Sequence, residues 1–157
     1  MNQNPYQSPN SDVAIEGRGD LIYAGFWVRI GAHIIDTILI IIITWPILFA
    51  VYGKGYFNSE SIVAGPWDIL ISYVFPALAV ILFWNYRAAT PGKILLKIKI
   101  IDDKTGGKLT TGQCVGRYFA YIISILPLML GIFWVAFDKK KQGWHDKLAG
   151  TVCIRDK

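Results

Sequence analysis

Two long apolar blocks dominate the hydrophobic pattern of the chain, one at residues 23–52 and one at 67–86. A bilayer span needs about 20 apolar residues, so each block is long enough for a membrane-crossing helix. Pro46 should end or kink the first helix. Pro76, near the middle of the second block, is tolerated where neighbouring helices satisfy the freed backbone groups. The pattern therefore predicts two spanning helices.

A third apolar block covers residues 115–137, but Pro127 and Gly131 interrupt it near its centre. The block can form one full span. It can also form a helix–break–helix hairpin that enters and leaves the membrane on one side. Each arm of such a hairpin would be ~16 Å long, which is about half of a ~30 Å hydrocarbon core.

The segment between the second and third blocks, residues 90–111, has a different character. Thr90 and Pro91 are typical of a helix N-cap followed by proline at the first helical position. Residues 97–102 alternate between polar and apolar, which predicts a half-buried strand. A turn-forming stretch follows, and residues 108–110 can return as a second strand. We therefore expect a short helix and a small β-hairpin on the membrane surface.

The basic tail, residues 138–155, predicts one helical turn and a last strand. Residues 145–149 suit a helical turn that Gly150 stops as a C-cap. The strand expected at 151–154 needs a partner, because a single strand is unstable. Its candidate partners lie in the 90–111 segment, so both segments must lie on one face of the membrane.

The first 22 residues are polar and lack the basic and apolar regions of a signal peptide, so we expect a disordered tail. Composition supports a membrane domain over residues 23–155. Hydrophobic residues make up 54% of the chain and charged residues 17%, against about 25% charged in soluble domains. The expected fold class is an all-α integral membrane protein with two long spanning helices, a third apolar helical unit and a small cytoplasmic β element.

Positive charge sets the expected orientation. Residues 87–108 hold six Lys and Arg, the tail from 139 to 157 holds six more, and the connector 53–66 holds one. By the positive-inside rule the connector lies outside and the N-terminus is cytoplasmic. Three full spans would place the basic tail outside, so the rule favours the hairpin. The net charge of +5 lies beside apolar blocks, which fits anionic lipid headgroups better than nucleic acid.

Three polar residues interrupt the first apolar block, at Arg29, His33 and Asp36. Their spacing of i, i+4 and i+7 places them on one helix face, with Asp36 ~10 Å deeper than Arg29. A carboxylate inside a bilayer is costly unless it is paired. It can belong to a polar network that clamps helices together, or to an ion or proton site. The candidate partners are Asn85, Arg87, Arg117 and the tail.

His145 and Asp146 form a second candidate, in which the carboxylate could hold the imidazole tautomer. The alternative is a surface turn whose Asp146 pairs with a lysine or arginine. Two histidines without metal-binding motifs indicate no metal site. No nucleophile–base–orienter set indicates an enzyme, no cofactor is implied, and both cysteines should be reduced thiols.

Three sequence blocks together resemble the RDD family of bacterial membrane proteins. They are residues 24–36 with Arg29 and Asp36, the stretch Thr90-Pro91-Gly92-Lys93, and residues 141–151 with Asp146. The resemblance implies that Arg29 is the family arginine and Asp36 its first aspartate. It places the second aspartate at Asp146, with Asp138 as the rival position.

The resemblance implies a multi-pass protein of the bacterial inner membrane, and some family members have been linked to ion antiport. We expect a non-enzymatic membrane module, assembled with itself or a partner protein. Arg29, Asp36 and Asp146 would form its internal polar network. The alternative is a cation/proton antiporter or small-solute transporter. Asp36 would then bind the ion, with Arg29 and His33 setting its pKa.

Overall fold

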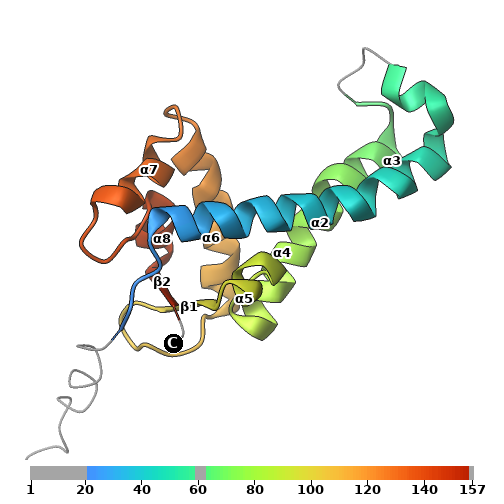
Figure 1. Cartoon of the computed structure of the whole chain (residues 1–157). Helices are drawn as coiled ribbons and strands as arrows, with labels where there is room; N and C mark the ends of the chain where they lie inside the picture. The colour runs from blue at the N-terminus through green and yellow to red at the C-terminus, as the bar shows by residue number, and fades with distance from the viewer. Residues whose placement is uncertain (1–20, 59–62, 156–157) are drawn as a thin grey trace, which may run out of the picture.

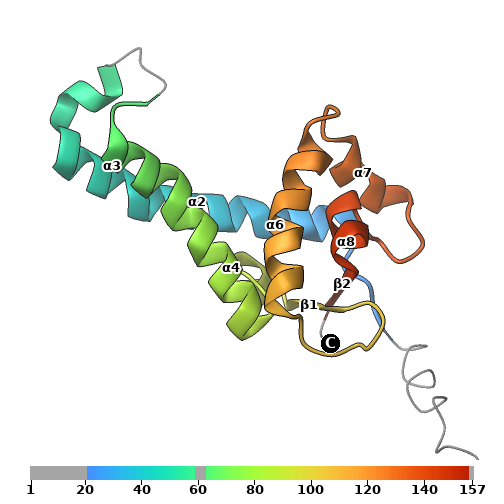
Figure 2. The same cartoon turned by 180° about the vertical axis from the view of Figure 1, so that it is seen from behind.

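The computed structural model describes residues 21–58 and 63–155. The tail predicted over residues 1–22 lies outside these ranges, apart from its last two residues. The described chain is mostly helical, with a small two-stranded sheet. Figures 1 and 2 show α2 and α4 extending together to one end of the molecule, while α6, α7, α8 and the sheet gather at the other.

Two helices are long and apolar enough to cross a membrane, Phe26–Tyr56 and Pro66–Arg87. The first span consists of α2 (Phe26–Tyr52) and the first turn of the 3-10 helix η1 (Gly53–Asn58). The α-helix passes through Pro46 and ends at Gly53, whose left-handed φ of +69° suits a glycine. Of the two predicted effects of Pro46, ending the helix is therefore wrong.

The second spanning helix changes its winding before Pro76. It begins as α3 (Pro66–Ile69), continues as the π-helical turn η2 (Leu70–Val74), and ends as α4 (Phe75–Arg87). Proline has no backbone N–H to donate, and a local π turn is one way to accommodate this loss within a helix. Pro76 is thus absorbed within the helix, as the sequence indicated.

The sheet joins two segments far apart in the sequence. After α5 (Pro91–Leu95), β1 (Ile98–Asp102) pairs antiparallel with β2 (Thr151–Arg155), with Ile100 opposite Cys153. The strand expected at 151–154 is confirmed, but the hairpin partner predicted at 108–110 is wrong. Leu109 is buried in the core. Thr110 instead caps α6 in a capping box with Gln113, which competes with strand formation.

The third apolar block forms a sharply bent pair of helices. The axes of α6 (Thr111–Ile125) and α7 (Leu130–Phe137) are bent by 99° at the break around Pro127. Leu128 and Met129 adopt left-handed backbone conformations there. Such a pair can be a broken span or a re-entrant hairpin. The chain then forms α8 (Trp144–Ala149), which Gly150 ends with a φ of +62°.

The buried core lies where the helices meet the sheet. Its members are mostly small or β-branched, with Trp84 as the largest: Ala24, Ala32, Trp84, Ala88, Ile98, Ile100, Leu109, Cys114 and Cys153. Both cysteines are free and buried. By contrast, large apolar side chains along α2, α4 and the α6–α7 bend are exposed in the isolated chain. Exposed apolar surface on this scale is expected where lipid covers a protein.

Close packing inside the α6–α7 bend generates a first prediction. A Cβ added at Gly131 would lie 2.7 Å from the Cα of Ser124, whereas one added at Gly116 of α6 would meet nothing within 4 Å. We expect Gly131→Ala to lower the free energy of unfolding by about 1–3 kcal/mol through overpacking. Gly116→Ala should leave it unchanged or raise it by about 1 kcal/mol through helix propensity. Thermal unfolding in detergent measures both, and equal midpoints would contradict the packing.

Candidate functional site

Asp146 lies at the centre of a buried charge cluster. It is the third residue of α8, and its Oδ2 accepts a hydrogen bond of 3.0 Å from the N–H of Gly143, the residue that precedes the helix. The carboxylate is fully buried. Acidic groups stabilise helix N-termini, so the local sequence explains why an aspartate sits here. Burial alone, however, would strongly disfavour its charge.

Two arginines from separate helices neutralise this carboxylate. Arg29 of α2 places Nη1 2.5 Å from Oδ2, and Arg117 of α6 pairs with Oδ1 through Nη2. Both arginines are buried, Arg117 completely and Arg29 with 6% of its surface exposed. The cluster Arg29–Asp146–Arg117, called the RDR triad below, thereby joins α2, α6 and α8.

Both arginines also donate hydrogen bonds to other parts of the protein. Arg29 donates from Nε to the carbonyl of Ala24 at 2.9 Å and from Nη2 to that of Lys141 at 2.5 Å. Arg117 donates from Nη1 to the hydroxyl of Thr151, the first residue of β2. The triad therefore also fixes the strand and both ends of the 141–151 stretch.

The electrostatics of the triad keep Asp146 ionised. Burial would raise the pKa of Asp146, but the charges of Arg117 and Arg29 outweigh it and hold that pKa far below its usual range. With both arginines protonated, the triad carries a net charge of +1. Breaking a buried pair of this kind costs about 3–5 kcal/mol, because the remaining charge loses its partner.

Aromatic rings form the wall of the triad. The guanidinium of Arg117 lies 5.4 Å from the ring centroid of Trp84 and 5.9 Å from that of Tyr121. His145 stacks on Tyr121 with centroids 3.9 Å apart. Burial lowers the pKa of His145 well below its usual value, so its imidazole is neutral at pH 7. Its Nε2 lies 3.7 Å from Oδ1 of Asp146, which is too far for a hydrogen bond that would fix the tautomer.

Asp36, which like Arg29 lies on α2, forms a second polar contact between elements, called the Asp36 joint below. Its Oδ2 accepts the hydroxyl of Thr90 at 2.5 Å, and its Oδ1 accepts the N–H of Gly92 at 2.7 Å. A Cβ at Gly92 would collide with the backbone carbonyl of Ala32, so only glycine allows this approach. The Thr90–Lys93 motif thus docks α5 onto α2.

Asp36 also lies between two cavities inside the helical region. One, of about 220 Å³, is lined almost entirely by apolar side chains of α2 and α4. The other, of about 200 Å³, includes His33, Trp84 and Tyr121 in its wall. Within residues 21–58 and 63–155, no three or more His, Cys, Asp or Glu side chains gather as metal ligands.

Lys93, the last residue of the Thr90–Lys93 motif, is a buried cation. It is 1% exposed, and its ammonium lies 5.5 Å from the ring centroid of Trp84. Its Nζ has no hydrogen-bond acceptor among the described residues. The tryptophan face is the favourable contact that this charge does make.

The structure divides the predicted polar residues into two groups. Arg29 and Asp146 meet in the triad beside His145, whereas Asp36 meets Thr90 and Gly92. The single network expected for Arg29 and Asp36 is therefore divided in two. Of the candidate partners, the tail supplies Asp146 to Arg29 and Arg117 joins the same cluster. Asp36 instead takes its partners from Thr90 and Gly92. Arg29 and Asp36 share a helix face but lie ~10 Å apart along the axis, so different elements reach them.

Arg117, one of the candidate partners predicted for the polar network, pairs with Asp146 and not with Asp36, and the sequence explains why it needs a partner. Arg117 is the sole charged residue within the apolar block 115–137. A charge in such a block needs a buried partner. Asp138, the rival position for the second aspartate, lies elsewhere and pairs with Lys147 at 2.5 Å.

Comparisons with known proteins found a matching family and several similar bacterial proteins. A model described as the RDD family matches residues 23–150. The Bacillus subtilis protein YxaI is 30% identical over 82% of this chain and 94% of its own length. The Bacillus subtilis membrane protein YteJ is 30% identical over 86% of this chain and 82% of its own length. The Rickettsia prowazekii protein RP437 is 41% identical over 48% of this chain and 41% of its own length.

No solved structure is significantly similar to this chain. The family match includes Arg29, Asp36 and Asp146, the residues around which both polar joints are built. The chain therefore belongs to the RDD family.

Proposed function

We propose that this protein is a non-enzymatic module of the bacterial inner membrane, which acts through assembly with itself or with a partner protein. Its RDR triad fastens α8 and the sheet onto the spanning helices. The observation that carries this proposal is that both carboxylate oxygens of Asp146 face arginines, at zero exposure. A charge so placed is suited to holding helices together rather than to exchanging ions.

The contacts of Asp36 favour the same role. Both of its oxygens accept hydrogen bonds from α5 and the residue before it. An ion that bound there would have to displace the Thr90 hydroxyl or the Gly92 N–H. The two aspartates thus serve as two attachment points on α2, one for α8 and one for α5.

The proposed orientation has a cytoplasmic N-terminus, with the α6–α7 pair as a re-entrant hairpin. The pairing of β1 with β2 supports this arrangement, because the strands before and after the hairpin lie side by side. The basic 87–108 loop and the basic tail then share the cytoplasmic face, as the positive-inside rule requires.

A cation/proton carrier centred on Asp36 is a second candidate, and one specific observation favours it. Asp36 lines both cavities of the helical region, one of them together with His33. A carboxylate between two cavities is where a carrier would bind a cation or proton. This candidate requires the Asp36 contacts to open during transport.

If the RDR triad holds the helices together, the substitution Asp146→Asn should strongly lower the stability of the protein. The substitution leaves two buried guanidiniums without a counter-charge, so we expect the free energy of unfolding to fall by about 3–5 kcal/mol. Asp103→Asn is the matched control, because the Asp103–Lys140 pair is partly exposed and should contribute about 1 kcal/mol or less. Denaturant unfolding in detergent compares them, and equal losses would refute the clamp.

The orientation predicts a labelling pattern for single cysteines. In a background in which Cys114 and Cys153 are replaced by alanine, cysteines at positions 104 and 139 should react from the cytoplasmic face. A cysteine at position 54 should react from the opposite face. A membrane-impermeant maleimide on intact and inverted vesicles measures this. Opposite sides for positions 104 and 139 would instead establish a third full span.

Proteoliposomes separate the module from the carrier. We expect wild-type protein to give no collapse of a pH gradient on addition of Na⁺, K⁺ or Li⁺. Asp36→Asn should then lower the free energy of unfolding by about 1.5–3 kcal/mol, through loss of charge-assisted hydrogen bonds. Cation-dependent flux in wild type, abolished in an Asp36→Asn protein of unchanged stability, would establish the carrier and overturn the module.

A further inference from the structure

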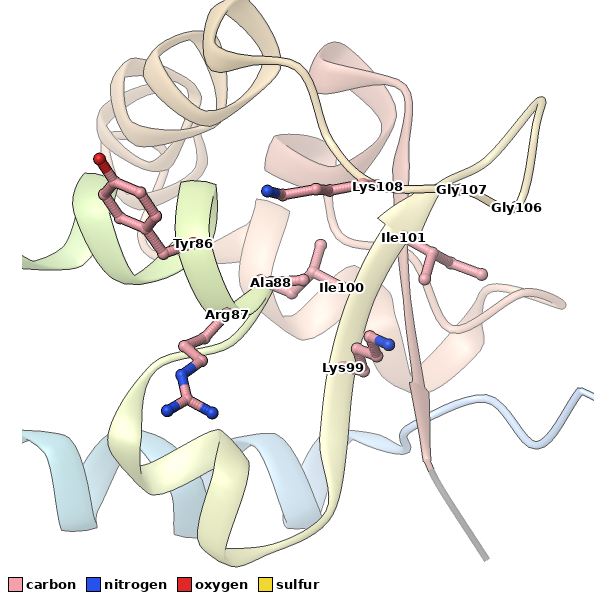
Figure 3. Close-up of a pocket in the computed structure, with 9 residues that line it drawn as sticks. All are labelled: Tyr86, Arg87, Ala88, Lys99, Ile100, Ile101, Gly106, Gly107 and Lys108. Carbon is pink, nitrogen blue, oxygen red and sulfur yellow. The ribbon is translucent and has the colours of Figure 1, made fainter.

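We propose that a cavity beside the end of α4 binds the phosphate group of an anionic phospholipid headgroup. The cavity has a volume of about 370 Å³ and lies between the C-terminal end of α4, β1 and the Gly106–Lys108 segment. Figure 3 shows the residues around it. It is separate from the RDR triad and from the Asp36 joint, and the inference does not depend on the proposed function.

The cavity wall carries three positive charges and no carboxylate. The cations are Arg87, Lys99 and Lys108, and all three are exposed. None of them forms an ion pair with a described residue. An excess of three uncompensated cations around one hollow favours an anionic occupant.

The acidic residues nearest in sequence are already engaged. The carboxylate of Asp102 accepts hydrogen bonds from Gln113 at 2.5 Å and from the N–H of Thr105 at 2.7 Å. Asp103 pairs with Lys140 at 2.9 Å. These contacts hold both carboxylates away from the cavity wall, which leaves its positive charge for a ligand.

Three different elements supply the cations. Arg87 is the last residue of α4, Lys99 lies on β1, and Lys108 comes from the segment before α6. Figure 3 shows the Lys108 side chain extending toward the end of α4, while Arg87 leaves that end in another direction. The left-handed φ of Ala88, at +55°, turns the chain between α4 and β1. Positive charge from three separate elements distinguishes this cavity wall from one charged helix face.

The position of the cavity favours a lipid over a soluble anion. Arg87 ends the apolar span Pro66–Arg87, which places the cavity at headgroup depth. Tyr86, in the cavity wall, is 73% exposed, as is common for tyrosine at a membrane interface. A guanidinium and two ammonium groups suit a phosphate oxyanion, and free phosphate shares this chemistry. The bilayer, however, holds headgroups permanently at this depth.

The test uses the full-length protein in neutral detergent. Its thermal midpoint is measured against short-chain phosphatidylglycerol, phosphatidylcholine of equal chain length, and soluble glycerol phosphate. The cavity variant is Arg87→Gln/Lys99→Gln/Lys108→Gln. The matched control, Lys54→Gln/Lys139→Gln/Arg155→Gln, removes the same charge from other exposed positions. The single variant Lys108→Gln covers the case in which the triple variant fails to fold.

We expect phosphatidylglycerol to stabilise wild type and control equally, and phosphatidylcholine to do so weakly. The half-saturating phosphatidylglycerol concentration should rise about tenfold in the cavity variant and measurably in Lys108→Gln, since exposed charge contacts are individually weak. Equal responses in the cavity and control variants would overturn the site. Stabilisation of wild type by glycerol phosphate as strong as that by the lipid would overturn the headgroup as its occupant.

Discussion

The rest of the structure depends on one buried carboxylate. Asp146 can remain ionised without water because Arg29 of α2 and Arg117 of α6 each contact one of its two carboxylate oxygens. The buried arginines need that charge in turn, since a desolvated guanidinium without a counter-charge is also costly. The three side chains are therefore interdependent, and their pairing fixes where α2, α6 and α8 meet. The strand β2 begins directly after α8, so the contacts that hold α8 also fix the position of β2.

The spanning helix α2 serves as a frame with two attachment points. Arg29 receives α8, and Asp36, about two turns further along, receives the start of α5. Between these points the apolar contacts are made by small residues such as Ala32, against which Gly92 packs. Close backbone approach replaces large side chains here, as is common between helices in membranes. The polar contacts fix where α5 and α8 lie along α2, and the small residues allow the backbones of α2 and α5 to approach closely.

Most of the architecture was predictable from the sequence, because long apolar blocks and turn residues act locally. The two spanning helices, the break near Pro127, the helical turn before Gly150 and the last strand all followed from such patterns. The pairing of the last strand with a strand of the 90–111 segment was also predicted correctly. A second strand at 108–110 was misassigned as a hairpin partner of β1, because the Thr110–Gln113 capping box competes with a strand, and that signal was present in the sequence. The separate partners of Arg29 and Asp36 depend on tertiary contacts, which helix periodicity alone does not specify.

The separation of 117 positions between Arg29 and Asp146 has a consequence for biogenesis. At about 5–20 residues per second, the arginine is made roughly 6–23 s before its counter-charge emerges from the ribosome. During that interval α2 must be held in the membrane with an unneutralised guanidinium near its end. Assembly of the polar centre thus waits until α8 has been made. A chain truncated before α8 would retain both arginines and lack the anion they share, so its helices would carry two unpaired charges where the complete protein has a closed cluster.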